Sequence, residues 1–108
     1  MENSQILHQL NACAAICNIC YEACLNEEDI AMLSRSIELT RDCADLCQLS
    51  AAALTRDSEF VDSILKLCAD VCETCAMECE KHEHEHCQRC AGVCRKCAEM
   101  CNEHQQVS

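Results

Sequence analysis

Residues 87–101 read CQRCAGVCRKCAEMC, with cysteines at positions 87, 90, 94, 97 and 101. The intervals alternate between three and four residues, which gives a repeat of seven. An α-helix returns to the same face at these intervals, so the spacing places all the thiols of this segment on one stripe of a helix.

Similar spacing occurs in three other segments, with cysteines at 13, 17, 20 and 24, at 43 and 47, and at 68, 72, 75 and 79. Good helix formers such as Ala, Leu and Glu surround them. We predict helices over 4–26, 28–55, 58–81 and 84–105, with Asp57 and Ser58 as the N-cap of the third. Short connections make neighbouring helices antiparallel, so we expect an all-α, up-down-up-down four-helix bundle that forms a single domain over 1–108.

Composition excludes several other classes of protein. The 108 residues include no proline, one glycine and two aromatic residues, which disfavours a turn-rich β fold and a conventional aromatic core. A net charge of −11 disfavours binding to nucleic acid or to an anionic membrane. Residues 1–8 carry neither the basic segment nor the apolar run of a signal peptide, so we expect a cytoplasmic protein.

The polar and apolar residues indicate which way the thiols face. Apolar residues extend the thiol stripes, namely Ile6, Leu10, Leu54, Val61 and Leu65. Charged residues are expected on the opposite faces, namely Glu22, Asp45, Asp70, Glu78, Arg95 and Glu99. We therefore expect inward thiols that line the core of the bundle.

Fifteen inward thiols are more than packing requires, and disulfides along the helices would strain their geometry. In a reducing cytosol, a metal site is the better interpretation. The candidate ligands are Cys13, Cys17, Cys20, Cys24, Cys43, Cys47, Cys68, Cys72, Cys75, Cys79, Cys87, Cys90, Cys94, Cys97 and Cys101.

Thiolates select Cu(I), Zn²⁺ or iron–sulfur clusters. Zinc needs four ligands, and the two cysteines of segment 28–55 would complete at most about two four-thiolate layers. Cu(I) accepts two or three sulfurs, and replacing a thiol proton by Cu⁺ leaves the charge of the core unchanged. We expect multiple Cu(I) ions, on the order of one per cysteine, with proton release.

These repeated C-x-x-x-C pairs, such as Cys13/Cys17, Cys68/Cys72 and Cys97/Cys101, resemble those of the bacterial copper storage proteins. The resemblance covers essentially the whole chain, although segment 28–55 carries only one such pair. It implies a cysteine-rich four-helix bundle that binds many Cu(I) ions, assembles as a homotetramer and serves copper homeostasis. The chain looks like the cytosolic members of that family.

A second cluster of metal-binding residues lies at one end of the predicted bundle. His82, His84 and His86 sit in the segment HEHEH beside Cys79 and Cys87, and Met32 is expected on nearly the same face as Cys43. Imidazole and thioether both bind Cu(I). We expect this end to be the mouth through which copper passes, and the apolar residues to plug the other end. His104 is a weaker candidate ligand, and His8 is expected at the surface.

The main hypothesis is therefore a non-enzymatic protein that buffers or sequesters cytosolic Cu(I). The alternatives are a zinc or iron–sulfur protein and a thiol-redox protein. A redox cysteine is normally partly exposed with a lowered pKa, whereas these thiols are numerous and inward. The sequence contains no catalytic triad pattern, phosphate-binding loop or paired catalytic carboxylates.

Overall fold

The chain folds into four long antiparallel helices. The computed structural model describes residues 2–107. The elements are α1 (Glu2–Leu25), the 3₁₀ helix η1 (Ile30–Leu33), α2 (Ser34–Thr55), α3 (Val61–Cys79) and α4 (Glu85–Val107). The prediction of an all-α, up-down-up-down bundle is confirmed, while positions 1 and 108 of the predicted domain lie outside the described residues.

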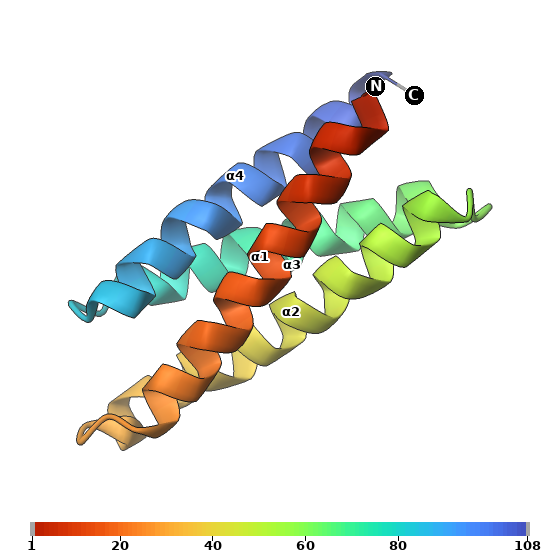
Figure 1. The fold of residues 1–108 in the computed structure, drawn as a ribbon. Coiled ribbons are helices and arrows are strands. Elements are labelled where there is room, and N and C mark those ends of the chain that lie inside the picture. Colours follow the sequence, from red (N-terminus) through yellow and green to blue (C-terminus); the bar gives the residue numbers. More distant parts are fainter. Residues whose placement is uncertain (1, 108) are drawn as a thin grey trace.

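The arrangement of the helices creates two different ends (Figure 1). The chain termini and the α2–α3 turn at residues 56–60 lie together at what we call the terminal end. The other two connections form the opposite end, which we call the histidine end and define as residues 26–33 and 80–86. Each helix packs against two neighbours, α1 and α3 both contacting α2 and α4, in a bundle of 44 × 20 × 19 Å.

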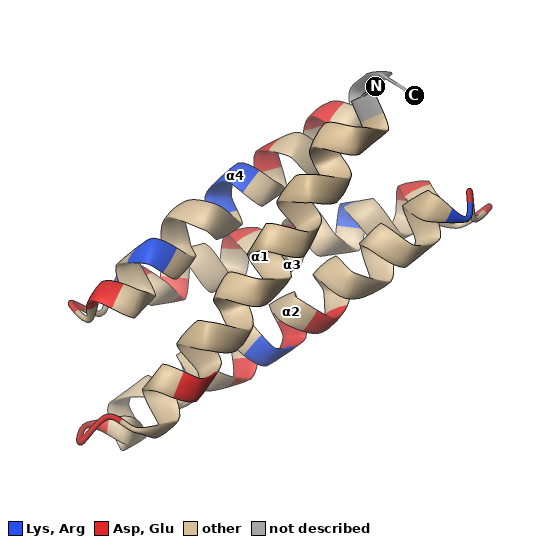
Figure 2. Ribbon diagram, in the orientation of Figure 1, with Lys and Arg blue, Asp and Glu red and all other residues tan. Residues whose placement is uncertain are grey.

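Apolar side chains fill the terminal end of the core. Ile6, Leu10, Leu54 and Leu65 are buried there and Val61 is half-buried, as the sequence predicts for a plug. Charged residues are spread over the helices and the connections (Figure 2), and most of those whose burial the structure describes are exposed. None of the helices in residues 2–107 has an apolar segment long enough to cross a membrane.

Glu78 contradicts the expectation that it lies on an outer face. It is only 8% exposed, because it lies beside three basic side chains. Its carboxylate is 3.2 Å from Lys81 Nζ, 3.5 Å from Arg35 Nε and 3.1 Å from His82 Nε2. These contacts tie α2 to the end of α3.

The predicted start of the second helix at residue 28 is wrong, because α2 begins at Ser34. Residues 26–29 form turns, and the Met32 N–H donates to the Asp29 carbonyl in η1. Glu27 and Asp29 bind histidines of the 80–86 segment instead of starting a helix. A tertiary interaction thus overrides the local preference of this acidic segment.

The predicted N-cap at Asp57 and Ser58 is also wrong, because α3 begins at Val61 without a side-chain cap. Asp57 adopts a φ of 57° just after α2. The Asp57 and Ser58 N–H groups donate back to the Leu54 and Ala53 carbonyls, which is the hydrogen-bond pattern of a Schellman motif. These residues therefore end α2 rather than start α3. All the other helix boundaries lie within two residues of the predicted ones.

Candidate metal centre

All fifteen cysteines are buried and none forms a disulfide. Each is 0–1% exposed, so the thiols form a continuous column between the apolar plug and the histidine end. The seven-residue repeat produces this column because the thiols of each helix stay on the side that faces the bundle axis. The predicted cysteine-lined core is therefore present.

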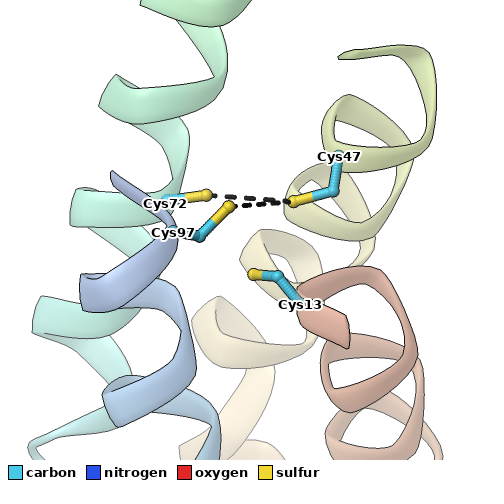
Figure 3. Close-up of side chains that lie close together, drawn as sticks. All are labelled: Cys13, Cys47, Cys72 and Cys97. Atoms are coloured by element: carbon cyan, nitrogen blue, oxygen red, sulfur yellow. Dashed lines mark hydrogen bonds between the residues drawn. The ribbon is translucent and has the colours of Figure 1, made fainter. Parts of the chain in front are cut away.

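Thiols from different helices lie close enough to share an ion. Cys43 Sγ of α2 is 3.5 Å from Cys72 Sγ and 3.7 Å from Cys94 Sγ. Figure 3 shows Cys13, Cys47, Cys72 and Cys97 pointing toward one another, one from each helix. In that group, Cys47 Sγ lies 3.9 Å from both Cys72 Sγ and Cys97 Sγ.

Most of these separations match those of sulfurs that bind one soft ion, and the Cys43 contacts at 3.5 and 3.7 Å are slightly shorter. With thiolate–metal bonds of about 2.3 Å, two sulfurs on one ion lie about 3.8 to 4.6 Å apart, from tetrahedral to linear coordination. Within helices, the Cys13/Cys17 and Cys90/Cys94 pairs have Sγ–Sγ distances of 4.0 and 3.9 Å. The C-x-x-x-C pairs and the contacts between helices therefore both provide suitable sites.

Neighbouring sites use the same sulfurs. Cys13, Cys17, Cys43 and Cys94 form one group with sulfurs within 4.8 Å of one another. Cys13 also belongs to the group of Figure 3, and Cys17 and Cys94 also belong to a group with Cys75 and Cys90. Filling every site thus requires sulfurs that bridge ions, which suits two- or three-coordinate Cu(I) better than separate four-thiolate zinc sites.

The core has no positive charge of its own to balance thiolates. Among residues whose burial the structure describes, the buried polar side chains are Ser36, Thr40, Ser50 and Glu78. Burial raises the pKa of the Cys87 thiol to about 12 and also raises that of Cys24. These thiols are therefore neutral near pH 7, and an ion that binds them must displace their protons.

Among the three histidines of HEHEH, His86 faces the thiols. Its Nδ1 lies 3.3 Å from Cys20 Sγ, 3.6 Å from Cys87 Sγ and 4.0 Å from Cys24 Sγ. Together these residues form a mixed sulfur and nitrogen site where the thiol column meets the histidine end. On the other side of the ring, Nε2 lies 2.8 Å from Glu27 Oε2.

The other two histidines lie at the same end, where the His84 side chain is 28% exposed and that of His82 is 15% exposed. His84 stacks on His86 with ring centroids 5.3 Å apart, and its Nε2 is 3.1 Å from Asp29 Oδ1. His82 instead pairs with Glu78, as described above, with Nε2 3.1 Å from Glu78 Oε2. The three neighbouring histidines of the sequence thus occupy different environments.

Met32 does not continue the face of Cys43 as expected. It lies in η1 rather than in α2, and it is 73% exposed. His104 is half-buried at the terminal end, in a groove with Leu54 and Ser58, and His8 is exposed.

Sequence reasoning missed the carboxylates Glu27 and Asp29 that contact the histidines. The acidic residues 27–29 could have indicated these contacts, because the topology places the connection that contains them at the same end as the histidines.

Almost the whole chain matches one known protein family. The sequence profile described as "Copper storage protein" matches residues 1–106. An uncharacterised cysteine-rich protein of Bacillus subtilis (strain 168), YhjQ, is 49% identical over 76 residues, which cover 70% of each chain.

Solved structures share both the fold and much of the sequence. The Cu(I)-bound copper storage protein BsCsp3 has a TM-score of 0.91 and 43% identity, covering 95% of this chain and 97% of its own. A cytosolic copper storage protein from Streptomyces lividans, in a structure with five coppers, has a TM-score of 0.94 and 37% identity, covering 97% and 92%. Given the family match over residues 1–106 and these two structures, the chain belongs to the copper storage protein family.

Proposed function

We propose that this protein stores Cu(I) in its thiol column, on the order of one ion per cysteine. The observation that carries the proposal is the set of fifteen buried, unbridged thiols whose sulfurs belong to overlapping groups. Shared sulfurs allow many ions in a small volume, and replacing each proton by Cu⁺ adds no charge to the core, whose described residues include no buried lysine or arginine. Structures of relatives with bound copper support the same choice of metal.

An anaerobic titration with Cu(I) in the presence of a competing chelator tests the capacity. We expect binding to continue to about one ion per cysteine. Saturation at only about three or four ions would contradict the proposal, because that number fits separate four-thiolate sites. Metal analysis of protein from copper-supplemented cells should find copper, and a visible absorption band would instead indicate an iron–sulfur cluster.

We further propose that copper enters at the histidine end. His84 is the most exposed of the three histidines and stacks on His86, and His86 forms a group with Cys20, Cys24 and Cys87. Changing His82, His84 and His86 together to alanine should slow loading and removal while leaving the capacity of the thiols almost unchanged. His8→Ala is the matched control, since His8 is exposed on α1 away from this end. Equal rates in the triple variant and the control would exclude this route.

The proposed role is buffering or sequestration in the cytosol by a single-domain, non-catalytic protein that assembles as a homotetramer. The cytosolic Streptomyces lividans relative supports the location. Large apolar side chains that remain exposed, including Ile19, Leu67 and Met77, provide surface for assembly. Light scattering of the purified protein tests the tetramer, which a monomeric mass at micromolar concentration would contradict.

A further inference from the structure

We propose that Glu27 is a positioning residue for copper binding, which fixes His86 so that its Nδ1 lone pair faces the thiols of the histidine end. The inference rests on the proposed function and adds to it a residue that touches no sulfur. Glu27 and His86 are 59 positions apart in the sequence, and the fold brings them together where α1 ends and α4 begins.

The contacts of the ring select one tautomer. A neutral imidazole has one N–H donor and one acceptor nitrogen. His86 Nε2 lies 2.8 Å from Glu27 Oε2, so the N–H at Nε2 can donate to the carboxylate. The opposite tautomer would place the Nε2 lone pair against the carboxylate lone pairs. The carboxylate therefore favours an unprotonated Nδ1, which lies 3.3 Å from Cys20 Sγ.

The same contact restrains the orientation of the ring. The His86 side chain is 18% exposed and Glu27 is 30% exposed, so water screens their hydrogen bond only in part. Stacking with His84 covers one face of the His86 ring, at an interplanar angle of 9°. Carboxylates that bind the far nitrogen of a metal-binding histidine act in this way in other metal sites, where losing one typically costs about 10- to 100-fold in metal affinity.

The contact to His84 allows Glu27 to act on both rings, but the geometry favours His86. Glu27 Oε2 is 3.3 Å from His84 Nδ1, against 2.8 Å from His86 Nε2. The Nε2 of His84 is already bound to Asp29 Oδ1 and Oδ2 at 3.1 and 3.2 Å. Nδ1 of His84 faces Glu27 itself, whereas Nδ1 of His86 is close to three thiols.

Glu27→Gln tests the proposal with Glu28→Gln as its matched control. Both variants remove one negative charge from the same turn, and Glu28 is exposed. The first copper equivalents should bind about 10- to 100-fold more weakly to Glu27→Gln than to Glu28→Gln in competition with a Cu(I) chelator, at equal total capacity. Equal affinities in the two variants would overturn the role of Glu27. A low Cu(I) capacity of the unmodified protein would instead overturn the proposed storage function.

Two further measurements separate positioning from a general effect on the fold. In a His86→Ala background, Glu27→Gln should have no further effect on the first equivalents, whereas an additive loss would show that Glu27 does not act through His86. In the unmodified apo protein, ¹⁵N NMR of His86 should show a proton on Nε2 and none on Nδ1. A protonated Nδ1 would refute the proposed tautomer.

Discussion

Loading the core with Cu(I) should release about one proton per ion, from the first equivalent to the last. The prediction follows from burial, because all fifteen thiols are 0–1% exposed and the described core holds no buried lysine or arginine. Burial favours the neutral form of a thiol, as the pKa of about 12 for Cys87 illustrates. Each Cu⁺ that binds as a thiolate complex must therefore displace one H⁺.

The magnitude follows from the number of thiols. Full loading of fifteen cysteines should release about fifteen protons and leave the net charge at −11. One proton per ion also makes the affinity depend on pH, by about 1.36 kcal/mol or tenfold per pH unit for each ion. The sign is fixed, since raising the pH lowers the cost of removing the proton and so strengthens copper binding.

Hydrogen bonds between thiols make the early equivalents the most informative. Contact with Cys17 lowers the pKa of Cys13, and the same contact raises the pKa of Cys17. A thiolate that forms in the core therefore forms first where neighbouring thiols can donate to it. If such thiolates existed before loading, the first ions would release fewer protons than the later ones.

A pH-stat titration in an unbuffered anaerobic solution measures this ratio directly. Cu(I) is added as its acetonitrile complex, and the base needed to hold pH 7.5 is counted for each equivalent. A constant ratio of about one supports neutral thiols, whereas a ratio near about one half would refute the reasoning. A parallel titration with Zn²⁺ is the comparison, because an ion bound by four thiolates should release about four protons.

Three further predictions concern the apo protein. The buried hydroxyls of Ser36 and Ser50 have no hydrogen-bond partner among the residues that the structure describes, so Ser36→Ala and Ser50→Ala should each stabilise the reduced protein by about 1 kcal/mol in urea unfolding. Leu10→Ala should destabilise it by about 2–5 kcal/mol in the same assay, because Leu10 is fully buried in the plug, while copper capacity stays unchanged. Burial raises the pKa of Cys87 from 9.0 to about 12, so its contribution to stability is present below about pH 9 and is lost as the pH rises toward 12. The urea midpoint should therefore fall across that range, and a flat midpoint would contradict the pKa.

The thiol repeat was sufficient to predict the bundle, because burial of one stripe per helix leaves few ways to pack four helices. The turns were harder to predict for a local reason. Asp57 and Ser58 are residues that favour an N-cap, but here their backbone N–H groups close the preceding helix. The sequence does not distinguish these two uses, since they differ only in whether Asp57 takes a positive φ.

The metal centre, too, was predictable only in part. The column of thiols was predictable because each cysteine obeys the helical repeat. The different environments of His82, His84 and His86 were not, because they depend on carboxylates from other parts of the chain. The contact between Glu27 and His86 joins two connections that only the completed bundle brings together.

Helix α2 provides the strongest argument that the thiols serve binding rather than packing. Its inward stripe runs through Ser36, Thr40, Cys43, Cys47 and Ser50, with the same alternating intervals as the other helices. The three hydroxyl residues are as fully buried as the cysteines, and Thr40 satisfies its hydroxyl by donating to the Ile37 carbonyl. A bundle that accepts a hydroxyl at these positions does not need sulfur to fill its core. The fifteen positions that do carry sulfur are therefore best explained by the metal that sulfur binds.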